Sequence, residues 1–254
     1  MKTRFGILFV LFVVFLSGCA SHPQGPISLS RDAVVGQTGR IGVAMAPLPK
    51  VDMQVPGANC LLCLAVAYAA NSSLTSYGQT LSNEDLANLK NEVATLLRKK
   101  GANVTVIDTA LDVNALPDVA AKTPNTPRKD FSSLQRKYEI DKILIIDISE
   151  LGFSRTYSSY IPSSDPKAML RGAGYLVNLK NNTYEWYEPM FILKSADQVW
   201  DEPPKFPGLT NAYYQVLEMG KDRILQPLAA ATADTNQNTV SAAPTVAPPN
   251  GKLP

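Results

Sequence analysis

The chain has 254 residues, and its 24 basic and 22 acidic side chains leave a formal net charge of +2 at pH 7. This near balance excludes the basic excess that a nucleic-acid-binding protein needs, so we expect no nucleic acid among its partners. The single histidine, His22, lies close to the N-terminus, which leaves a Ser-His-Asp or Cys-His catalytic system without a base in a folded domain.

The N-terminal segment is built like a secretory signal. Lys2 and Arg4 precede an apolar run over residues 5–16, which is shorter than the roughly 20 residues that cross a bilayer. The run ends in Leu16-Ser17-Gly18-Cys19, which resembles the lipobox of bacterial lipoproteins. The resemblance implies cleavage before Cys19 and acylation of that residue on its thiol and on its new amine. An ordinary signal peptide with an incidental cysteine is the alternative.

The lipobox resemblance also implies a location. Two or three acyl chains on Cys19 would hold the mature chain permanently on a lipid bilayer, whereas one chain binds only marginally. Ala20 and Ser21 stand where an aspartate often retains such proteins at the inner membrane, so they imply the outer membrane, with the domain facing the periplasm. Loss of Lys2 and Arg4 with the signal lowers the formal charge from +2 to zero.

Composition divides the chain into four parts. We expect a signal peptide at 1–18, a lipidated linker at 19–38, a single α/β domain at 39–227 and a disordered tail at 228–254. The tail is rich in Ala, Pro and Thr and has almost no large apolar side chain, so burial cannot offset the entropy of ordering it.

The first half of the domain predicts a strand, a helix and a second strand. The strand at 39–46 is ended by prolines, and the region 50–80 that follows is poorly patterned. Ser82 is a natural N-cap for the next helix, and Gly101 occupies its C-terminal cap position. The apolar face of this helix comprises Leu86, Leu89, Val93, Leu96 and Leu97. A strand at 104–107 follows directly, which favours a right-handed crossover and a parallel pair.

The second half predicts a short helix at 130–138 and then three strands and a last helix. The strand at 140–148 is almost continuously apolar, which is typical of a central strand buried on both faces. Asn181-Asn182 favours a tight hairpin turn. The remaining predicted segments are loops at 112–128, 152–166 (alternatively an irregular strand extension) and 201–208, strands at 170–179 and 183–193, and a helix at 210–225.

This order of elements predicts an α/β fold. We expect a three-layer-like sandwich in which a mixed sheet has a parallel βαβ start and an antiparallel C-terminal meander, with helices packed on it. In outline it is similar to the α/β domain of CsgG, LpoB and the N-terminal domain of TolB. That resemblance implies an assembly or interaction module of the cell envelope that is not an enzyme and carries no cofactor.

Cys60 and Cys63 are the only local pair with possible chemistry. With Cys19 acylated they form an even pair, and in an oxidising compartment we expect them to form a disulfide, or two buried thiols, that pins an apolar loop. Thiol-disulfide exchange and metal binding are the alternatives, although a metal would need further ligands. The apolar stretch 61–70 predicts a buried helix or core segment, and an exposed surface for a partner or a membrane is the alternative.

Aromatic side chains crowd the second half of the chain. Strand alternation places Tyr184 and Trp186 on one face, where cross-strand aromatic pairs would stabilise the sheet. A surface that binds a protein partner or a glycan is the functional alternative, because Tyr and Trp supply large contact areas with a polar tip. The candidate residues for such a surface are Tyr157, Tyr160, Tyr184, Trp186 and Trp200.

These observations favour one function over two others. The first is a membrane-anchored periplasmic lipoprotein that acts as a non-enzymatic interaction or assembly module, with the bilayer and an envelope protein as partners and no cofactor or metal. The alternatives are a membrane-tethered thiol-disulfide oxidoreductase that uses Cys60 and Cys63, and a binder of small ligands or glycans.

Overall fold

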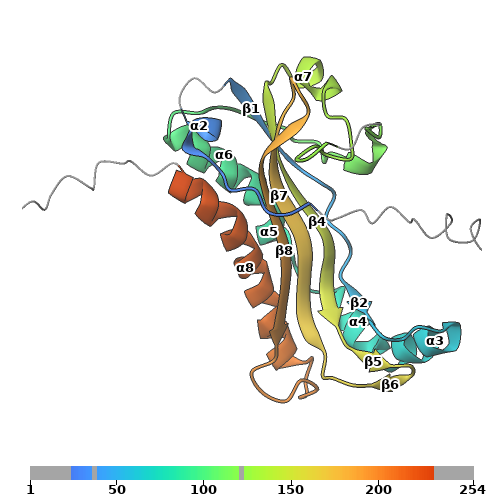
Figure 1. Cartoon of the computed structure of the whole chain (residues 1–254). Coiled ribbons are helices and arrows are strands. Elements are labelled where there is room, and N and C mark those ends of the chain that lie inside the picture. The colour runs from blue at the N-terminus through green and yellow to red at the C-terminus, as the bar shows by residue number, and fades with distance from the viewer. Residues whose placement is uncertain (1–23, 36–38, 120–122, 232–254) are drawn as a thin grey trace, which may run out of the picture.

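A mixed β-sheet organises the protein in a computed structural model that describes residues 24–35, 39–119 and 123–231. The strand order is β3-β1-β4-β7-β8, with β2 paired to β4 on the side of β1. Pairing is parallel among β1, β2, β3 and β4 and antiparallel from β4 through β7 to β8 (Figure 1). The strands are β1 Arg40–Met45, β2 Asp52–Gln54, β3 Asn103–Val106, β4 Lys142–Ser154, β7 Lys167–Asn178 and β8 Thr183–Ser195. The predicted α/β fold with a mixed sheet is confirmed.

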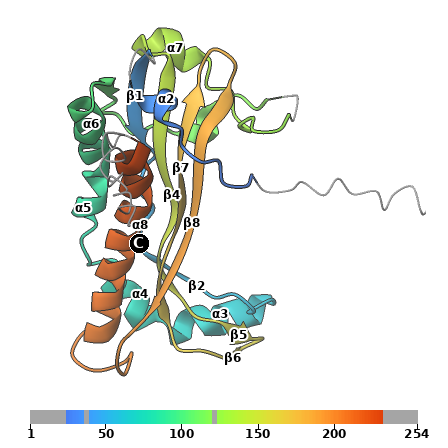
Figure 2. The same cartoon turned by 60° about the vertical axis from the view of Figure 1, so that its left-hand side comes forward.

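Helices cover both faces of this sheet. One face packs against α6 and the long helix α8, and the opposite face of its upper half packs against residues 107–116 and 131–140, which include α7 (Figure 2). Successive residues of β4 alternate between the two faces. Leu144 and Ile146 lie in the core on the side of α6 and α8, and Ile143 and Ile145 lie in the core on the opposite face. The helices are α2 Arg31–Val34, α3 Leu61–Ala70, α4 Ser72–Gly78, α5 Glu84–Ala87, α6 Leu89–Lys99, a 3₁₀ turn Val113–Ala115, α7 Ser133–Tyr138 and α8 Pro207–Ala231.

The central strand β4 confirms the prediction from its apolar run and extends it. Every residue from Lys142 to Ile146 is buried, as a strand covered on both faces requires. The strand continues to Ser154 instead of ending near Ile148, and its register with β7 shifts between Ile148 and Glu150. The extension carries the sheet beyond the predicted core and supports the lower end of the molecule.

The helix predicted from Ser82 is two helices. α5 begins after Asn83, and α6 begins after Asn88. Ser82 still accepts a hydrogen bond from the Glu84 backbone N–H, at 3.3 Å. Gly101 follows the C-terminal cap with φ +88°, a conformation that side chains other than glycine rarely adopt. The predicted apolar face is buried at Leu86, Leu89, Val93 and Leu97, and Leu96 is partly buried.

Both ends of the domain differ from the predicted boundaries. Within the expected linker, residues 24–35 pack on the domain, because Ala33 and Val34 are buried and Lys142 donates a hydrogen bond to the Ala33 carbonyl at 3.0 Å. At the other end, α8 continues to Ala231, and Leu228 is buried where we expected the tail to begin. The predicted signal at 1–18, Cys19, His22 and the tail beyond residue 231 lie outside the described residues.

The region 50–80, which has no clear pattern in the sequence, forms the lower end of the molecule. It contains β2, α3 and α4, and it lies beside a small hairpin made by β5 Tyr157–Ser158 and β6 Ile161–Pro162 (Figures 1 and 2). The hairpin occupies the segment that we expected as a loop or an irregular strand extension.

Candidate functional site

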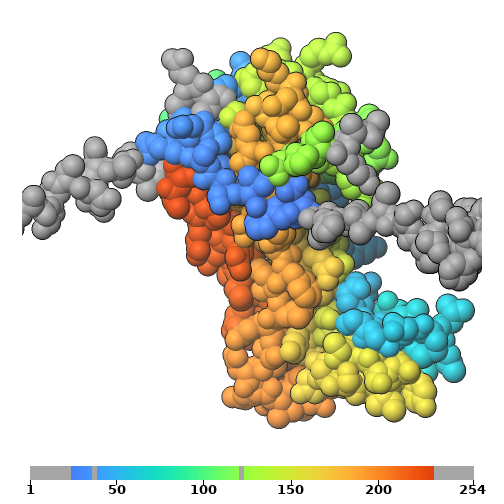
Figure 3. Space-filling view, viewed as in Figure 1, coloured from blue at the N-terminus to red at the C-terminus, as the bar shows by residue number. Residues whose placement is uncertain are grey.

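An exposed apolar surface at the lower end of the sheet is the candidate functional site. It comprises α3 and the β5–β6 hairpin, which we call the apolar lobe, and the two project together from the domain (Figure 3). Leu61 is 88% exposed and Leu62 is 71% exposed. The other exposed large apolar side chains of the lobe are Val66, Tyr68, Tyr160 and Ile161. Exposed apolar residues gathered in one place are typical of a contact surface in a folded protein.

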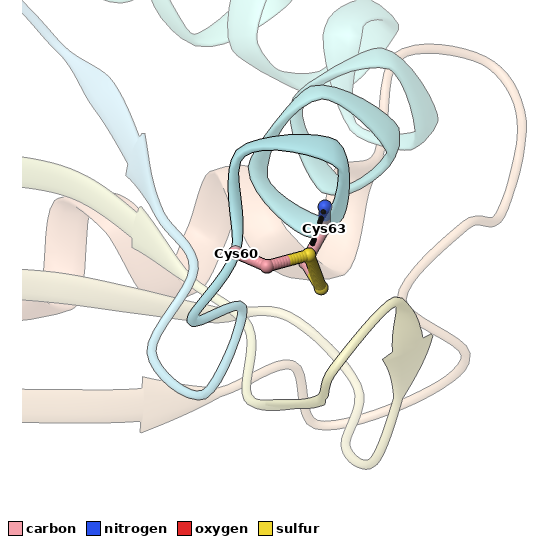
Figure 4. The surroundings of a disulfide bond; sticks show 2 residues. All are labelled: Cys60 and Cys63. Atoms are coloured by element: carbon pink, nitrogen blue, oxygen red, sulfur yellow. Dashed lines mark hydrogen bonds between the residues drawn. A yellow bond between two sulfur atoms is a disulfide. The ribbon is translucent and has the colours of Figure 1, made fainter.

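Helix α3 forms because its sequence favours a helix and its first turn is capped. Cys60 has an extended backbone, and its sulfur accepts a hydrogen bond from the Cys63 N–H at 3.0 Å (Figure 4). The residues that follow are Leu, Ala, Val, Tyr and a cysteine, with no glycine or proline before the helix ends at Asn71. Only Cys63 and Ala67 of this helix are buried.

The prediction that residues 61–70 are a buried core segment is therefore wrong. The helix is apolar on nearly every side, but only Cys63 and Ala67 are buried and Leu64 is partly buried against the domain core. Composition alone indicates burial for such a helix, and only the tertiary placement of α3 beyond the edge of the sheet leaves it exposed.

The lobe is held in place by hydrogen bonds between its two segments. The Tyr157 N–H donates to the Pro56 carbonyl at 2.8 Å, and the Ser159 N–H donates to the Gly57 carbonyl at 3.2 Å. A side chain at residue 57 would collide with the Tyr157 carbonyl, and its φ of +90° also favours glycine. These hydrogen bonds join the segment before α3 to the hairpin, although the two are far apart in the sequence. We therefore expect α3 and the hairpin to move as one unit.

Charge is absent from the apolar lobe and from the sequence on either side of it. No residue from 53 to 83 is charged, and neither is any residue from 156 to 164. The charged residue nearest to the hairpin in the sequence is Arg155, whose guanidinium donates to the Ser164 carbonyl at 2.9 Å and lies 5.0 Å from the centroid of the Trp200 ring. The exposed part of the lobe can therefore enter an apolar environment without desolvating a charged side chain.

The five aromatic residues that were the candidates for an alternative binding surface are divided between separate places. Tyr160 is exposed between the two strands of the hairpin, Tyr157 is buried, and the Trp200 ring packs against the Arg155 guanidinium. Trp186 is 1% exposed and lies in the core under α8, so its assignment to a surface is wrong. Tyr184 is half-buried on the opposite face of the sheet.

A β-bulge explains why Tyr184 and Trp186 do not share a face. Leu176 pairs with Trp186 and Val177 pairs with Tyr184, so Glu185 is an extra residue on β8. One extra residue inverts the alternation of side chains. The Glu185 carboxylate forms an ion pair with Lys142 at 2.6 Å and accepts a hydrogen bond from the Asn178 side chain at 2.8 Å.

A cluster of three tyrosines and one carboxylate lies on the face opposite α8 and was not apparent from the sequence. Tyr184 and Tyr187 have ring centroids 5.0 Å apart, and both rings pack against Tyr175. Burial raises the pKa of Asp147, and burial followed by the nearby Asp147 carboxylate raises the pKa of Tyr175. The charge on Asp147 is therefore disfavoured. We find no geometry among these groups that points to a reaction.

The two cysteines form a disulfide, as expected. Their Cα atoms are 4.9 Å apart, Cys60 is exposed, and Cys63 is buried against the domain. The bond closes the first turn of α3 and does not pin a loop (Figure 4).

Residues 24–35, 39–119 and 123–231 contain no group of three or more His, Cys, Asp or Glu side chains that could hold a metal ion. No helix among them is both long and apolar enough to cross a membrane. A shallow cleft of about 430 Å³ between α6 and α8 has no aromatic side chain in its lining.

No protein-family model and no curated protein matches the sequence. Among solved structures, the chain is similar to a PelC dodecamer from Paraburkholderia phytofirmans, with 9% identity, a TM-score of 0.31, and coverage of 79% of this chain and 95% of that one. It is also similar to lipoprotein GNA1162 from Neisseria meningitidis, with 16% identity, a TM-score of 0.26, and coverage of 71% and 95%. A third is the hypothetical protein CT253 from Chlamydia trachomatis, with 10% identity, a TM-score of 0.31, and coverage of 76% and 98%. All three TM-scores are low, and these likenesses carry no argument about function.

Proposed function

We propose that the protein is a bacterial lipoprotein whose α/β domain acts by surface contact and not by catalysis. Residues 1–18 are removed, Cys19 is acylated, and the domain is held at the outer membrane on its periplasmic side, where it contacts an envelope protein. The lipobox resemblance of Leu16-Ser17-Gly18-Cys19 and the residues Ala20 and Ser21 support the anchor and its location.

The exposure of the apolar lobe is the observation that carries the proposed mode of action. Exposed apolar area of this kind weakens solubility unless another molecule covers it. Because the lobe carries no charged side chain, covering it removes no charge from water. The absence of a histidine from residues 23–254 of the sequence supports a role without a Ser-His-Asp or Cys-His catalytic system.

Metabolic labelling tests the anchor. Cells that express the full chain receive an alkyne-bearing fatty acid, and we expect label on the wild type but not on Cys19→Ala. The Cys19→Ala variant should also keep its signal and migrate as a larger species. A wild-type chain that is cleaved elsewhere and carries no fatty acid would contradict the anchor.

Photo-crosslinking in living cells tests the mode of action. A benzophenone side chain is placed at Leu62 in one variant and, as a matched control, at Met219, an exposed apolar residue of α8. We expect a discrete adduct from Leu62, whether with a protein or with lipid, and none from Met219. Equal labelling from both positions, or no adduct from Leu62, would rule out the lobe as a contact surface.

Thiol-disulfide exchange is a second candidate, and one observation favours it. Cys60 is exposed at the start of α3, and its sulfur already accepts an N–H from the first turn, a position that stabilises a thiolate after reduction. Its neighbours Leu61 and Leu62 supply no positive charge. Thiol alkylation across glutathione buffers separates the two roles: a reduction potential below about −300 mV indicates a structural bond, and one of about −120 to −200 mV indicates an oxidant.

A further inference from the structure

We infer that the exposed face of α3 lies in the interfacial region of the phospholipid bilayer that carries the Cys19 anchor. The inference rests on the proposed lipid anchor and adds a second, non-covalent contact with the same membrane. It assigns one occupant to the apolar lobe, and it leaves the other surfaces of the domain to an envelope partner.

The side chains of the lobe fit a lipid interface. α3 has ten residues, so it is about 15 Å long, too short to cross a bilayer and suitable for lying in its surface. Leu61, Leu62 and Val66 supply apolar contact, and the hydroxyl groups of Tyr68 and Tyr160 would remain at the level of the lipid headgroups. The uncharged sequence from 53 to 83 places no ionic group in the apolar layer.

The exposed side chains spread too widely for a flat partner. At 100° per residue, the exposed positions from Leu61 to Tyr68 cover an arc of roughly 160°, and the domain is faced by Cys63, Leu64 and Ala67. The lobe is convex and projects from the end of the molecule (Figure 3). A protein would need a matching groove to cover such a surface, whereas fluid lipid adapts to it.

The anchor holds the bilayer close to this side of the domain. Gln24 is five residues beyond Cys19, and an extended chain of that length reaches about 18 Å at most. The next segment is fixed, because Ile27 and Tyr187 exchange two backbone hydrogen bonds of 2.8 and 3.1 Å. In both views the blue segment that precedes α2 runs toward the side on which α3 projects, and α8 lies on the opposite side (Figures 1 and 2).

The Cys60–Cys63 disulfide contributes by forming the helix in advance. A ten-residue helix is marginal in water by itself, and a cross-link within its first turn, together with the Cys60 cap, keeps α3 folded before it meets lipid. Contact with the membrane then costs less ordering entropy than folding on the surface would.

Photo-crosslinking of the purified protein tests this inference. The full lipidated chain is reconstituted in vesicles of phosphatidylethanolamine and phosphatidylglycerol, with no other protein present. The benzophenone side chain is placed at Leu62 or at Met219, and mass spectrometry identifies the adducts. We expect on the order of tenfold more phospholipid adduct from Leu62 than from Met219, the difference between an interfacial and a water-facing side chain.

Three outcomes overturn the inference. A dimer adduct from Leu62 would assign the lobe to a second copy of the chain. Vesicles that float with the protein but give no lipid adduct from Leu62 would remove the lobe from the membrane and leave the anchor intact. Protein that does not float with the vesicles would contradict the lipid anchor itself, and the inference would fall with it.

A doubly charged variant provides an independent check. Leu61→Glu combined with Leu62→Glu changes two exposed positions, so the fold should be retained, and thermal melting verifies this. We expect limited proteolysis of the membrane-bound protein to cleave α3 in this variant and not in the wild type, and Met219→Glu to behave as the wild type. Equal cleavage of α3 in all three proteins would contradict the inference.

Discussion

The Asn71 side-chain amide donates a hydrogen bond to the Tyr157 hydroxyl at 2.6 Å, joining residues that are 86 positions apart in the sequence. Asn71 is 3% exposed and also donates to the Ala67 carbonyl at 2.7 Å, so it links the end of α3 to the hairpin. This contact fixes the orientation of the apolar lobe relative to the sheet.

Removal of this contact should destabilise the lobe. Asn71→Ala leaves the Tyr157 hydroxyl and the Ala67 carbonyl without their donor, and we expect a loss of about 1–3 kcal/mol in the free energy of unfolding. Tyr157→Phe should cost less, and the double variant should show non-additivity of about 0.5–2 kcal/mol. Urea denaturation of the four proteins measures this coupling. Strictly additive effects would show that the two side chains do not interact.

Trp186 and Tyr160 should respond very differently to truncation. Trp186→Ala opens a cavity under α8 and should cost about 3–5 kcal/mol. Tyr160→Ala changes an exposed side chain and should stay within about 0.5 kcal/mol of the wild type. Equilibrium unfolding by urea measures both changes. If both residues belonged to a common surface, both substitutions would change the free energy of unfolding only slightly.

Asp147 should make the protein less stable as pH rises. Burial raises its folded-state pKa above the unfolded value of 3.8, so between these two pKa values the folded state binds more protons and stability falls with increasing pH. The penalty is complete above the folded-state pKa. Asp147→Asn should therefore be more stable than the wild type at neutral pH, and this advantage should shrink toward pH 4. Asp201→Asn, in an exposed loop, is the control for the thermal melts across pH.

Tyr213 should tolerate the loss of its hydroxyl group. The ring is fully buried in α8, its hydroxyl has no hydrogen-bond partner among the described residues, and burial raises its pKa to about 12. Tyr213→Phe removes a buried hydroxyl group that makes no hydrogen bond among the described residues. We therefore expect the free energy of unfolding to stay unchanged or to rise by about 1 kcal/mol. A loss of more than about 1 kcal/mol in urea denaturation would reveal a partner for this hydroxyl.

The sheet could be predicted because its signals are local. The apolar run at β4, the Asn181-Asn182 turn and the periodic leucines of α6 each specify their element without reference to the rest of the chain. Asn182 has φ +52°, as the predicted hairpin turn requires.

The candidate site could not be predicted in the same way. Apolar composition at α3 indicates burial, and its exposure depends on where the extended β4 places the neighbouring hairpin. The bulge at Glu185 separates Tyr184 from Trp186, and its extra residue forms an ion pair with Lys142, which is distant in the sequence. Neither the exposure of α3 nor the bulge at Glu185 can be inferred from a local sequence pattern.

Amide hydrogen exchange is the decisive experiment for membrane contact by the apolar lobe. Exchange is compared between the lipidated full chain on vesicles and the same chain in detergent-free solution after enzymatic removal of its acyl chains. We expect slower exchange on vesicles in α3 and in the hairpin at 157–162, with no change along α8. If the protein is bound to the vesicles and exchange in α3 is the same in both conditions, the apolar lobe does not contact the membrane.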